Sequence, residues 1–435
     1  MGARSGRFRN SRAGVRPPRR SPVLVKDLGV ALAGRLNELG SRLTQGARSD
    51  TNSVLGQRLV DAGLVPFGRT TTPEFAWNTT TESALTGVTR NPWDLDRTAG
   101  GSSGGSAAIV AAGAVPIAHA TDAAGSIRIP AASTGLFGLK PSRGRVSNGP
   151  ALDEAVSGLA TQLGVSRSVR DSAALLDAIS GIDSGSPFNI PAGRSGYLDA
   201  ARHDPAPLRI ALMTDGWGGK STSPAVAAAT LSVAALCEEL AHRVEQGHPD
   251  LGVSWDGFVH DSSVLWSANV ATWIADAAMA FGRSIDSTTV EPQTLAVYET
   301  GRAISAIDLI RALDARNTLT RRVTAFFDDV DILLTPSLPE VAIPVGTYTA
   351  NVMGLDGHQW TERLFTGSPF TPVANAAGLP AMTVPLSTDP VTGLPIGAQF
   401  IAGPGREDLL FRLAGQVERA RPWADRHPPV WAARR

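Results

Sequence analysis

The stretch of sequence that decides the fold is residues 100–140, GGSSGGSAAIVAAGAVPIAHATDAAGSIRIPAASTGLFGLK. Residues 100–106 are too rich in glycine for an ordinary helix or strand, because each glycine costs about 1 kcal/mol relative to alanine inside a helix. Residues 106–115 are small and apolar and predict a buried helix. Residues 116–119 then predict a short strand, and residues 121–126 a second turn of small residues. The pattern is turn, helix, strand and turn, with serine in both turns.

Two common explanations of a Gly/Ser cluster do not fit this one. A flexible linker would have polar neighbours, whereas this cluster runs directly into an apolar helix and strand. A Walker-type phosphate loop is excluded because no Gly-Lys-Ser/Thr closes the run. We therefore interpret the cluster as a place where the backbone takes conformations that side chains forbid.

Composition narrows the class of protein. The chain has 435 residues, of which 43% are hydrophobic and 18% charged, with 40 basic against 40 acidic residues. This balance gives no sign of nucleic acid or an anionic membrane as partner. The single cysteine, Cys237, excludes an intrachain disulfide and a thiolate-cluster metal site. Cys237 lies among Ala, Leu and Glu, and we expect a small core residue rather than a nucleophile.

Location is predicted from two further observations. No apolar run reaches the roughly 18 residues of a membrane span, so we expect a cytoplasmic protein. Residues 1–20 contain seven arginines and no acidic residue, and they lack the apolar region of a secretory signal. A transit peptide or a nucleic-acid-binding arm would also be Arg-rich, but we favour a disordered leader.

Strand-like and helix-like segments alternate along the rest of the chain. Residues 208–213 predict a strand that is followed by a helix over 223–242, and residues 395–401 a strand that is followed by a helix over 407–420. Residues 371–375 are predicted as a loop. This alternation favours an α/β layered fold over a helix bundle or a β-sandwich.

Lys26 directly follows a short apolar run, residues 21–25, that predicts a strand. A lysine in this place is commonly an exposed strand end. The alternative is a lysine held out of water, whose pKa is lowered so that it can act as a base. The residues alone do not separate these two interpretations.

Serines in two turns, a strand-terminal lysine and a glycine-rich backbone suggest acyl transfer, which needs a nucleophile, a base and backbone N–H groups aimed at the developing oxyanion. One arrangement is the nucleophile elbow of α/β-hydrolases, G-x-S-x-G, with Ser103 as nucleophile. That arrangement requires an acidic residue and then a histidine downstream. The chain has seven histidines, and none lies in a recognisable strand-end loop.

The second arrangement depends on a resemblance. Residues 100–106, continuing through Thr121-Asp-Ala-Ala-Gly-Ser126-Ile-Arg-Ile-Pro-Ala131 to Gly138-Leu-Lys-Pro141, resemble the core of the amidase signature family. Supporting similarity lies at residues 22–27, 68–75, 91–93, 334–336, 371–380 and 393–397. The resemblance implies an α/β fold in one large domain over 21–425, with a mixed β-sheet covered by helices on both faces. Within it we expect a catalytic core over 22–142 and a variable substrate region over about 180–330.

The resemblance also implies an amidohydrolase with a Ser–cis-Ser–Lys triad, acting on C–N bonds other than peptide bonds. Carried over by motif, the catalytic residues are Ser126 as nucleophile, Ser102 as relay in a cis peptide after Gly101, and Lys26 as base. The oxyanion hole is expected from the backbone N–H groups of residues 123–126, and Thr121 is expected to hold Lys26 or Ser102. The oxyanion and substrate-binding set is therefore Thr121, Ala123, Ala124 and Gly125. Asp122 and Arg128 are predicted as a structural pair.

The same resemblance implies a small-molecule amide as substrate, no metal and no organic cofactor, and it leaves homodimerisation open. The Ala123-Ala124 pair, together with Gly405-Arg-Glu-Asp408, is similar to enzymes of the 6-aminohexanoate cyclic-dimer hydrolase type. Only 25 residues precede Lys26, where family members carry several helical elements. This departure motivates an alternative, a catalytically silent remnant of the fold. A further alternative is an amidotransferase subunit acting on misacylated tRNA, which would need partner subunits.

Overall fold

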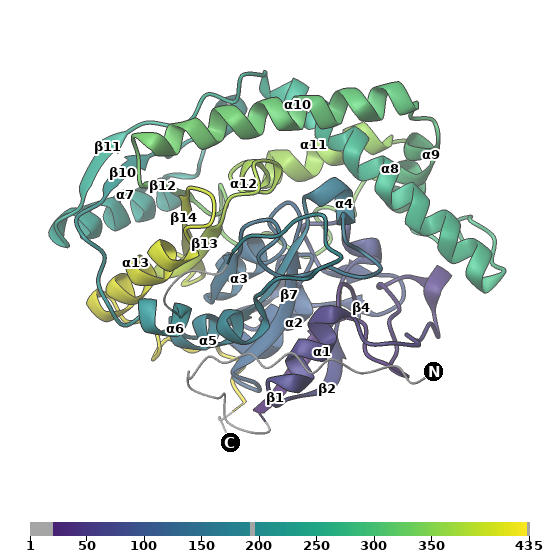
Figure 1. The fold of residues 1–435 in the computed structure, drawn as a ribbon, viewed down its shortest axis with the longest axis horizontal. Helices are drawn as coiled ribbons and strands as arrows, with labels where there is room; N and C mark the ends of the chain where they lie inside the picture. Colours follow the sequence, from purple (N-terminus) through teal and green to yellow (C-terminus); the bar gives the residue numbers. More distant parts are fainter. Residues whose placement is uncertain (1–20, 192–195, 433–435) are drawn as a thin grey trace.

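The computed structural model describes residues 21–191 and 196–432. The predicted leader, residues 1–20, lies outside this part of the chain. Figure 1 shows a central sheet with helices packed on both sides: α8 to α11 lie along the top and right of the view, and α1, α5, α6 and α13 lie below.

A ten-stranded sheet forms the centre of the fold, in the order β11-β10-β12-β14-β13-β8-β9-β7-β1-β2. Its strands are β1 (Ser21–Lys26), β2 (Leu64–Thr70), β7 (Ile117–Asp122), β8 (Phe137–Lys140), β9 (Thr161–Ser166), β10 (Arg209–Leu212), β11 (Arg243–Gln246), β12 (Ile332–Pro336), β13 (Ala381–Thr388) and β14 (Pro395–Ala402). Two small hairpins pair β3 (Glu82–Ser83) with β4 (Gly87–Val88) and β5 (Arg90–Asn91) with β6 (Asp94–Thr98).

The sheet is mixed, as the resemblance implies. Strands at its two ends are parallel, β2 with β1 and β1 with β7 on one side, and β11 with β10 and β10 with β12 on the other. The strands between them, from β7 through β9, β8, β13 and β14 to β12, pair antiparallel. Parallel neighbours bring the carboxyl ends of β1 and β7 to the same edge of the sheet.

Helices of very different lengths connect these strands. They are α1 (Val54–Asp61), α2 (Gly104–Ala111), α3 (Arg128–Thr134), α4 (Ala155–Gly158), α5 (Val169–Ile179), α6 (Tyr197–Ala200), α7 (Pro224–Glu239), α8 (Trp255–Phe281), α9 (Pro292–Arg302), α10 (Ala306–Ala325), α11 (Gly357–Gly367), α12 (Pro372–Ala376) and α13 (Glu407–Ala420). Several begin at a serine whose hydroxyl accepts a backbone N–H of the first turn, as Ser53, Ser168 and Ser223 do, which satisfies a donor that the helix cannot pair internally.

Each face of the sheet has its own hydrophobic core. Because side chains alternate along a strand, Ile332 and Leu334 of β12 belong to the core that also holds α1, α5, α7 and α13, whereas Leu333 belongs to the core under α8 to α11. Phe400 and Ile401 of β14 divide in the same way. The predicted architecture of a mixed sheet with helices on both faces is therefore confirmed.

Two details refine the expectations from the sequence. Residues 372–376 form a short helix, α12, where a loop was predicted, because Pro372 occupies the first helical turn and needs no backbone N–H there. Cys237 is fully buried in the first core, and burial raises the pKa of its thiol to about 12. The prediction of a small core residue is confirmed.

Helix α8 is long and largely apolar. Within the described residues it is the one helix that could cross a membrane by length and composition, with 44% of its most apolar window buried inside the protein. It packs against α9, α10 and α11. Most of its apolar residues between Trp255 and Ile274 are buried within the chain, as those of a core helix are, whereas Met279 and Phe281 near its end are exposed.

We predict that Phe400→Ala lowers the free energy of unfolding by about 3–5 kcal/mol, because it empties a fully buried site in a central strand. Val391→Ala, at a side chain that is 89% exposed, should change it by less than about 0.5 kcal/mol. Urea unfolding followed by circular dichroism measures both. Equal effects of the two changes would contradict this description of the core.

Candidate active site

The predicted site residues gather at the carboxyl ends of two parallel strands. Lys26 is the last residue of β1, and Thr121 and Asp122 are the last two residues of β7. Ser102 lies in the glycine-rich turn just before α2. In α/β sheets the carboxyl ends of the strands are the usual place for ligands.

Lys26 is completely buried and contacts two hydroxyl groups. Its Nζ lies 2.6 Å from Ser102 Oγ and 2.8 Å from Thr121 Oγ1. Burial lowers the pKa of Lys26 to about 7, and the Asp122 carboxylate opposes this shift only in part. Half of the amine is therefore neutral near pH 7, and the interpretation of Lys26 as an exposed strand end is excluded.

The neighbouring carboxylate of Asp27 does not reach this lysine, as alternation along the strand predicts. Its Oδ1 accepts the backbone N–H of Glu38 at 2.9 Å and lies 3.6 Å from Arg69 Nε. Arg69 in turn donates to the backbone carbonyl of Lys26 at 3.1 Å. Asp27 and Arg69 thus hold the turn after β1, and the amine of Lys26 stays without a directly bonded carboxylate.

The peptide bond between Gly101 and Ser102 is cis. The turn is packed so closely that only glycine fits at position 101, where a Cβ atom would lie 2.5 Å from the carbonyl oxygen of Thr80. This close approach gives a physical reason for the glycine run beside Ser102.

Ser126 lies in the turn between β7 and α3 and is half-buried. Within the part of the chain that the structure describes, its side chain has no hydrogen-bond partner, and the contacts of Lys26 are made to Ser102 and Thr121. The structure therefore joins the predicted base and relay directly and leaves the Ser126 hydroxyl free.

The backbone N–H groups of this turn differ from one another. Gly125 has φ +132°, and its N–H donates to Asp122 Oδ1 at 2.8 Å. Among the described residues, the N–H groups of Ala123, Ala124 and Ser126 have no acceptor. These three donors are free to bind a ligand oxygen, whereas Gly125 already has an acceptor.

A buried ion pair between Asp122 and Arg128 holds the turn between β7 and α3 in place. Arg128 and Asp122 are both fully buried, with Arg128 Nη2 2.9 Å from Asp122 Oδ1 and Arg128 Nε 3.0 Å from Oδ2. Asn375 and Gln399 accept further hydrogen bonds from the guanidinium. Burial would raise the pKa of Asp122, but the charge and hydrogen bonds of Arg128 outweigh it and hold that pKa at about 2. The predicted structural pair is confirmed.

Ser103, the nucleophile of the alternative elbow arrangement, has a different environment. It is fully buried, and its hydroxyl lies 3.3 Å from both the backbone carbonyl oxygen and the backbone nitrogen of Thr121. No histidine of the described chain hydrogen-bonds to it. Ser103 therefore links the glycine-rich turn to β7.

Two features of the site were missed from the sequence. His119 accepts the backbone N–H of Lys26, and nothing in the local pattern distinguished it from the other histidines. The second feature is Lys140, one of only three lysines among the 40 basic residues. It is completely buried, and its positive charge helps to lower the pKa of Asp122.

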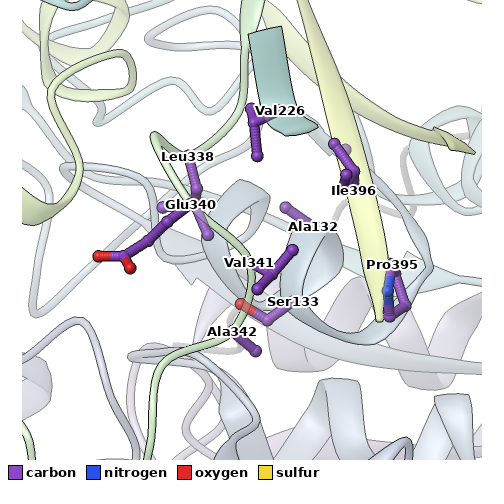
Figure 2. A pocket seen from close by; sticks show the side chains of 10 residues that line it. Ala132, Ser133, Val226, Leu338, Glu340, Val341, Ala342, Pro395 and Ile396 are labelled. Carbon is purple, nitrogen blue, oxygen red and sulfur yellow. The ribbon is translucent and has the colours of Figure 1, made fainter. Parts of the chain in front are cut away.

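Two pockets of the described chain are lined by residues other than Lys26, Ser102 and Ser126. Figure 2 shows a small cavity between α3 and the segment 338–342, lined by Ser133, Val226, Glu340 and Ile396 among others. Its volume of about 10 Å³ holds no more than about one water molecule. A groove of about 360 Å³ runs along β2 and is lined by Asp27, Arg69 and Phe67 among others.

No group of three or more His, Cys, Asp and Glu side chains within residues 21–191 and 196–432 could hold a metal ion.

Comparison with known proteins places this chain in a family. The sequence profile of the amidase family matches residues 21–411. The chain is 36% identical to 6-aminohexanoate-cyclic-dimer hydrolase of Paenarthrobacter ureafaciens, over 94% of this chain and 84% of that protein. It is 38% identical to putative amidase AmiC of Mycobacterium tuberculosis, over 94% and 83%.

Solved structures agree with the sequence comparison. The structure of 6-aminohexanoate cyclic dimer hydrolase with substrate matches with a TM-score of 0.88 at 34% identity, covering 94% of this chain and 86% of that one. A bacterial aryl acylamidase of the amidase signature family matches with a TM-score of 0.82 at 26% identity, covering 93% and 83%. The chain belongs to the amidase family. It is a hydrolase of amides and acts on C–N bonds.

We predict that Asp122→Asn lowers the free energy of unfolding at pH 7 by about 3–5 kcal/mol, because it leaves the buried Arg128 charge without its carboxylate. Since the folded pKa of Asp122 is lowered to about 2, the stabilisation is present above the unfolded value near 3.9 and is lost as pH falls toward 2. Urea unfolding between pH 2 and pH 7 measures it. Glu245→Gln, in the exposed pair with Arg243, is the control and should cost less than about 1 kcal/mol.

Proposed function

We propose that this amidase works through an acyl-enzyme formed on Ser126, with Ser102 as proton relay and Lys26 as base. The observation that carries the proposal is the buried contact of 2.6 Å between Lys26 Nζ and Ser102 Oγ. A lysine that hydrogen-bonds to a serine, with its pKa lowered by burial, is a base that can accept a proton near neutral pH.

The proposed reaction has two half-reactions. Ser126 Oγ attacks the carbonyl carbon of the amide while its proton passes to Ser102 Oγ, and the Ser102 proton passes to Lys26 Nζ. The relay then runs in reverse and protonates the leaving nitrogen, so that the C–N bond breaks and an ester with Ser126 remains. Water attacks this ester through the same relay and releases the carboxylic acid and Ser126.

The negative charge that develops on the carbonyl oxygen needs donors that are already in place. We assign this role to the backbone N–H groups of the turn over residues 123–126. The free N–H groups of Ala123, Ala124 and Ser126 support this assignment, and the N–H of Gly125 would have to leave Asp122 to join them. Thr121 supports the base, because its hydroxyl lies 2.8 Å from Lys26 Nζ.

For the substrate we propose amides of small aliphatic amino acids, cyclic ones included. The identity of 36% to a protein named 6-aminohexanoate-cyclic-dimer hydrolase, over 94% of this chain, supports this class. A screen of linear, aryl and cyclic amides, with the released amine measured by mass spectrometry, tests it. Turnover of aryl amides alone would remove the cyclic aliphatic class from the proposal.

We predict that Ser126→Ala abolishes both amide hydrolysis and covalent labelling by a fluorophosphonate probe, because it removes the attacking oxygen. Ser102→Ala should lower the labelling rate by at least about 100-fold, the scale of a lost proton relay. Intact-protein mass spectrometry measures labelling, and Ser103→Ala is the control that keeps its labelled serine. Labelling that persists in Ser126→Ala and disappears in Ser103→Ala would contradict the proposal. A folded wild-type protein that takes no label would favour the silent remnant.

We predict that kcat/KM rises about tenfold per pH unit below pH 7 and levels off above it, because only neutral Lys26 can accept the proton and its pKa is about 7. Initial rates between pH 5 and pH 9 measure this limb. Lys26→Met should lose activity throughout. Lys140→Met is the matched control, since burial also lowers the pKa of Lys140 to about 7. A limb that disappears with Lys140 would contradict the assignment.

A further inference from the structure

The backbone N–H of Lys26 is bound by a side chain. At this position in a sheet, the neighbouring strand would ordinarily supply a backbone carbonyl group. The parallel pairing of β1 with β7 joins Leu24 to Ala118. Two residues further along β1, the N–H of Lys26 donates to Nδ1 of His119 at 3.3 Å. The peptide that carries the predicted base is therefore fixed by an imidazole ring.

The other side of the ring determines which nitrogen carries the proton. His119 Nε2 lies 3.0 Å from Gln162 Oε1, and Gln162 Nε2 donates to Asn148 Oδ1 at 2.9 Å. Because the amide nitrogen of Gln162 is directed to Asn148, its oxygen faces the ring and must accept. The proton of His119 is thus on Nε2, and Nδ1 is free to accept the N–H of Lys26.

The packing around His119 and Gln162 favours this hydrogen-bond arrangement. A Cβ atom at Gly29 would lie 2.6 Å from Gln162 Oε1 and 2.7 Å from Thr121 Cγ2. The glycine therefore makes room at the same time for the oxygen that orients His119 and for a residue that contacts Lys26 Nζ. His119 as a whole is 1% exposed, so that water does not compete for its ring nitrogens.

We propose that His119 is a positioning residue, which holds the end of β1 so that the amine of Lys26 reaches Ser102 in its buried, neutral form. The inference depends on the proposed role of Lys26. A protonated imidazole would direct a second N–H at the N–H of Lys26 and break the contact, so His119 must stay neutral while the enzyme works.

The charges around the ring favour the neutral form. Burial lowers the pKa of His119 to about 3; the hydrogen bond to Gln162 opposes this shift, and the positive charges of Lys26 and Arg69 add to it. Arg69 comes from β2, and Asp122, at the end of β7, is the carboxylate that acts on Lys26. His119 therefore does not titrate between pH 5 and pH 9, and a pH limb in that range reports on Lys26.

The chain contains a matched control far from the site. His242 accepts the backbone N–H of Leu208 on Nδ1 at 3.1 Å, and its Nε2 lies 2.9 Å from Gln416 Oε1. It is buried beside β10 and β11, at the opposite end of the sheet order from β1. Removing this imidazole takes the same kind of acceptor from a buried backbone N–H without touching Lys26.

The test compares His119→Leu, His119→Asn and His242→Leu. Asparagine places an oxygen near the position of Nδ1, so it keeps the acceptor that leucine lacks. The first measurement is the pH profile of kcat/KM. The second is the titration of Lys26 by NMR of 13Cε-lysine-labelled protein, where only three lysines contribute and Lys26→Met identifies the resonance. The NMR titration needs no turnover.

We expect His119→Leu to raise the pKa of Lys26 by about one unit, because the amine is no longer held in its buried place. Activity at pH 7 then falls about fivefold, since the neutral fraction of the amine drops from about one half to about one tenth, and most of the loss is recovered at pH 9. The activity of His119→Asn should stay within about threefold of that of the wild type at both pH 7 and pH 9. His242→Leu should lower the melting temperature about as much as His119→Leu does. It should leave the pH profile of kcat/KM and the NMR titration of Lys26 unchanged.

The outcomes separate this inference from the proposed function. A shifted Lys26 titration in His119→Leu, in a protein that hydrolyses no amide, would support positioning and overturn the proposed function. An unshifted titration, or an equal shift in His242→Leu, would overturn positioning. If His119→Leu does not fold, Gln162→Leu replaces it: this variant keeps the ring and frees its tautomer, and a Lys26 titration equal to wild type would overturn the inference.

Discussion

The burial of one amine organises this protein. Lys26 Nζ lies at the end of a strand, fully buried, with two hydroxyl groups as its partners. Burying a charged ammonium is costly unless a carboxylate pairs with it, and the nearby carboxylates are engaged elsewhere, Asp122 by Arg128 and Asp27 by Glu38 and Arg69. The amine therefore gives up its proton near neutral pH. The sheet edge, the glycine-rich turn and the buried ion pair all serve to keep these groups in that arrangement.

Much of this could be predicted from the sequence, for reasons that lie in particular residues. The run of glycines before Ser106 indicated close backbone packing, and position 101 has room only for hydrogen. Alternation along β1 correctly placed Asp27 away from the amine. The resemblance supplied Lys26 and Ser102 as partners, although they are 76 residues apart. Parallel pairing brings the end of β1 to the end of β7, and the contact of Ser103 with Thr121 brings the turn that carries Ser102 to the same place. This arrangement is a property of the fold and not of either segment.

What could not be predicted depends on contacts across the sheet. The role of His119 arises because the pairing of β1 with β7 leaves the N–H of Lys26 to be bound by a side chain. No local pattern encodes that register. The hydrogen bond from the Gly125 N–H to Asp122 could not be predicted either. A turn of small residues gives no sign of which backbone N–H group is already bonded. The short helix α12 was missed because its five residues are too few for a periodic pattern. It nevertheless carries Asn375, which bonds Arg128 and Asp122.

The distribution of basic residues shows how the two kinds of buried cation differ. Arg128 and Lys26 are both completely buried, and Asp122 connects them: Arg128 lowers the pKa of Asp122, and the Asp122 carboxylate acts in turn on the pKa of Lys26. A guanidinium keeps its proton inside proteins and offers a planar set of donors, so Arg128 serves as a permanent charge that bonds Asp122, Asn375, Gln399 and the carbonyl of Thr371. An amine on a flexible stem can lose its proton when water is removed. Of the three lysines in the chain, Lys26 and Lys140 are completely buried, and burial lowers the pKa of each to about 7.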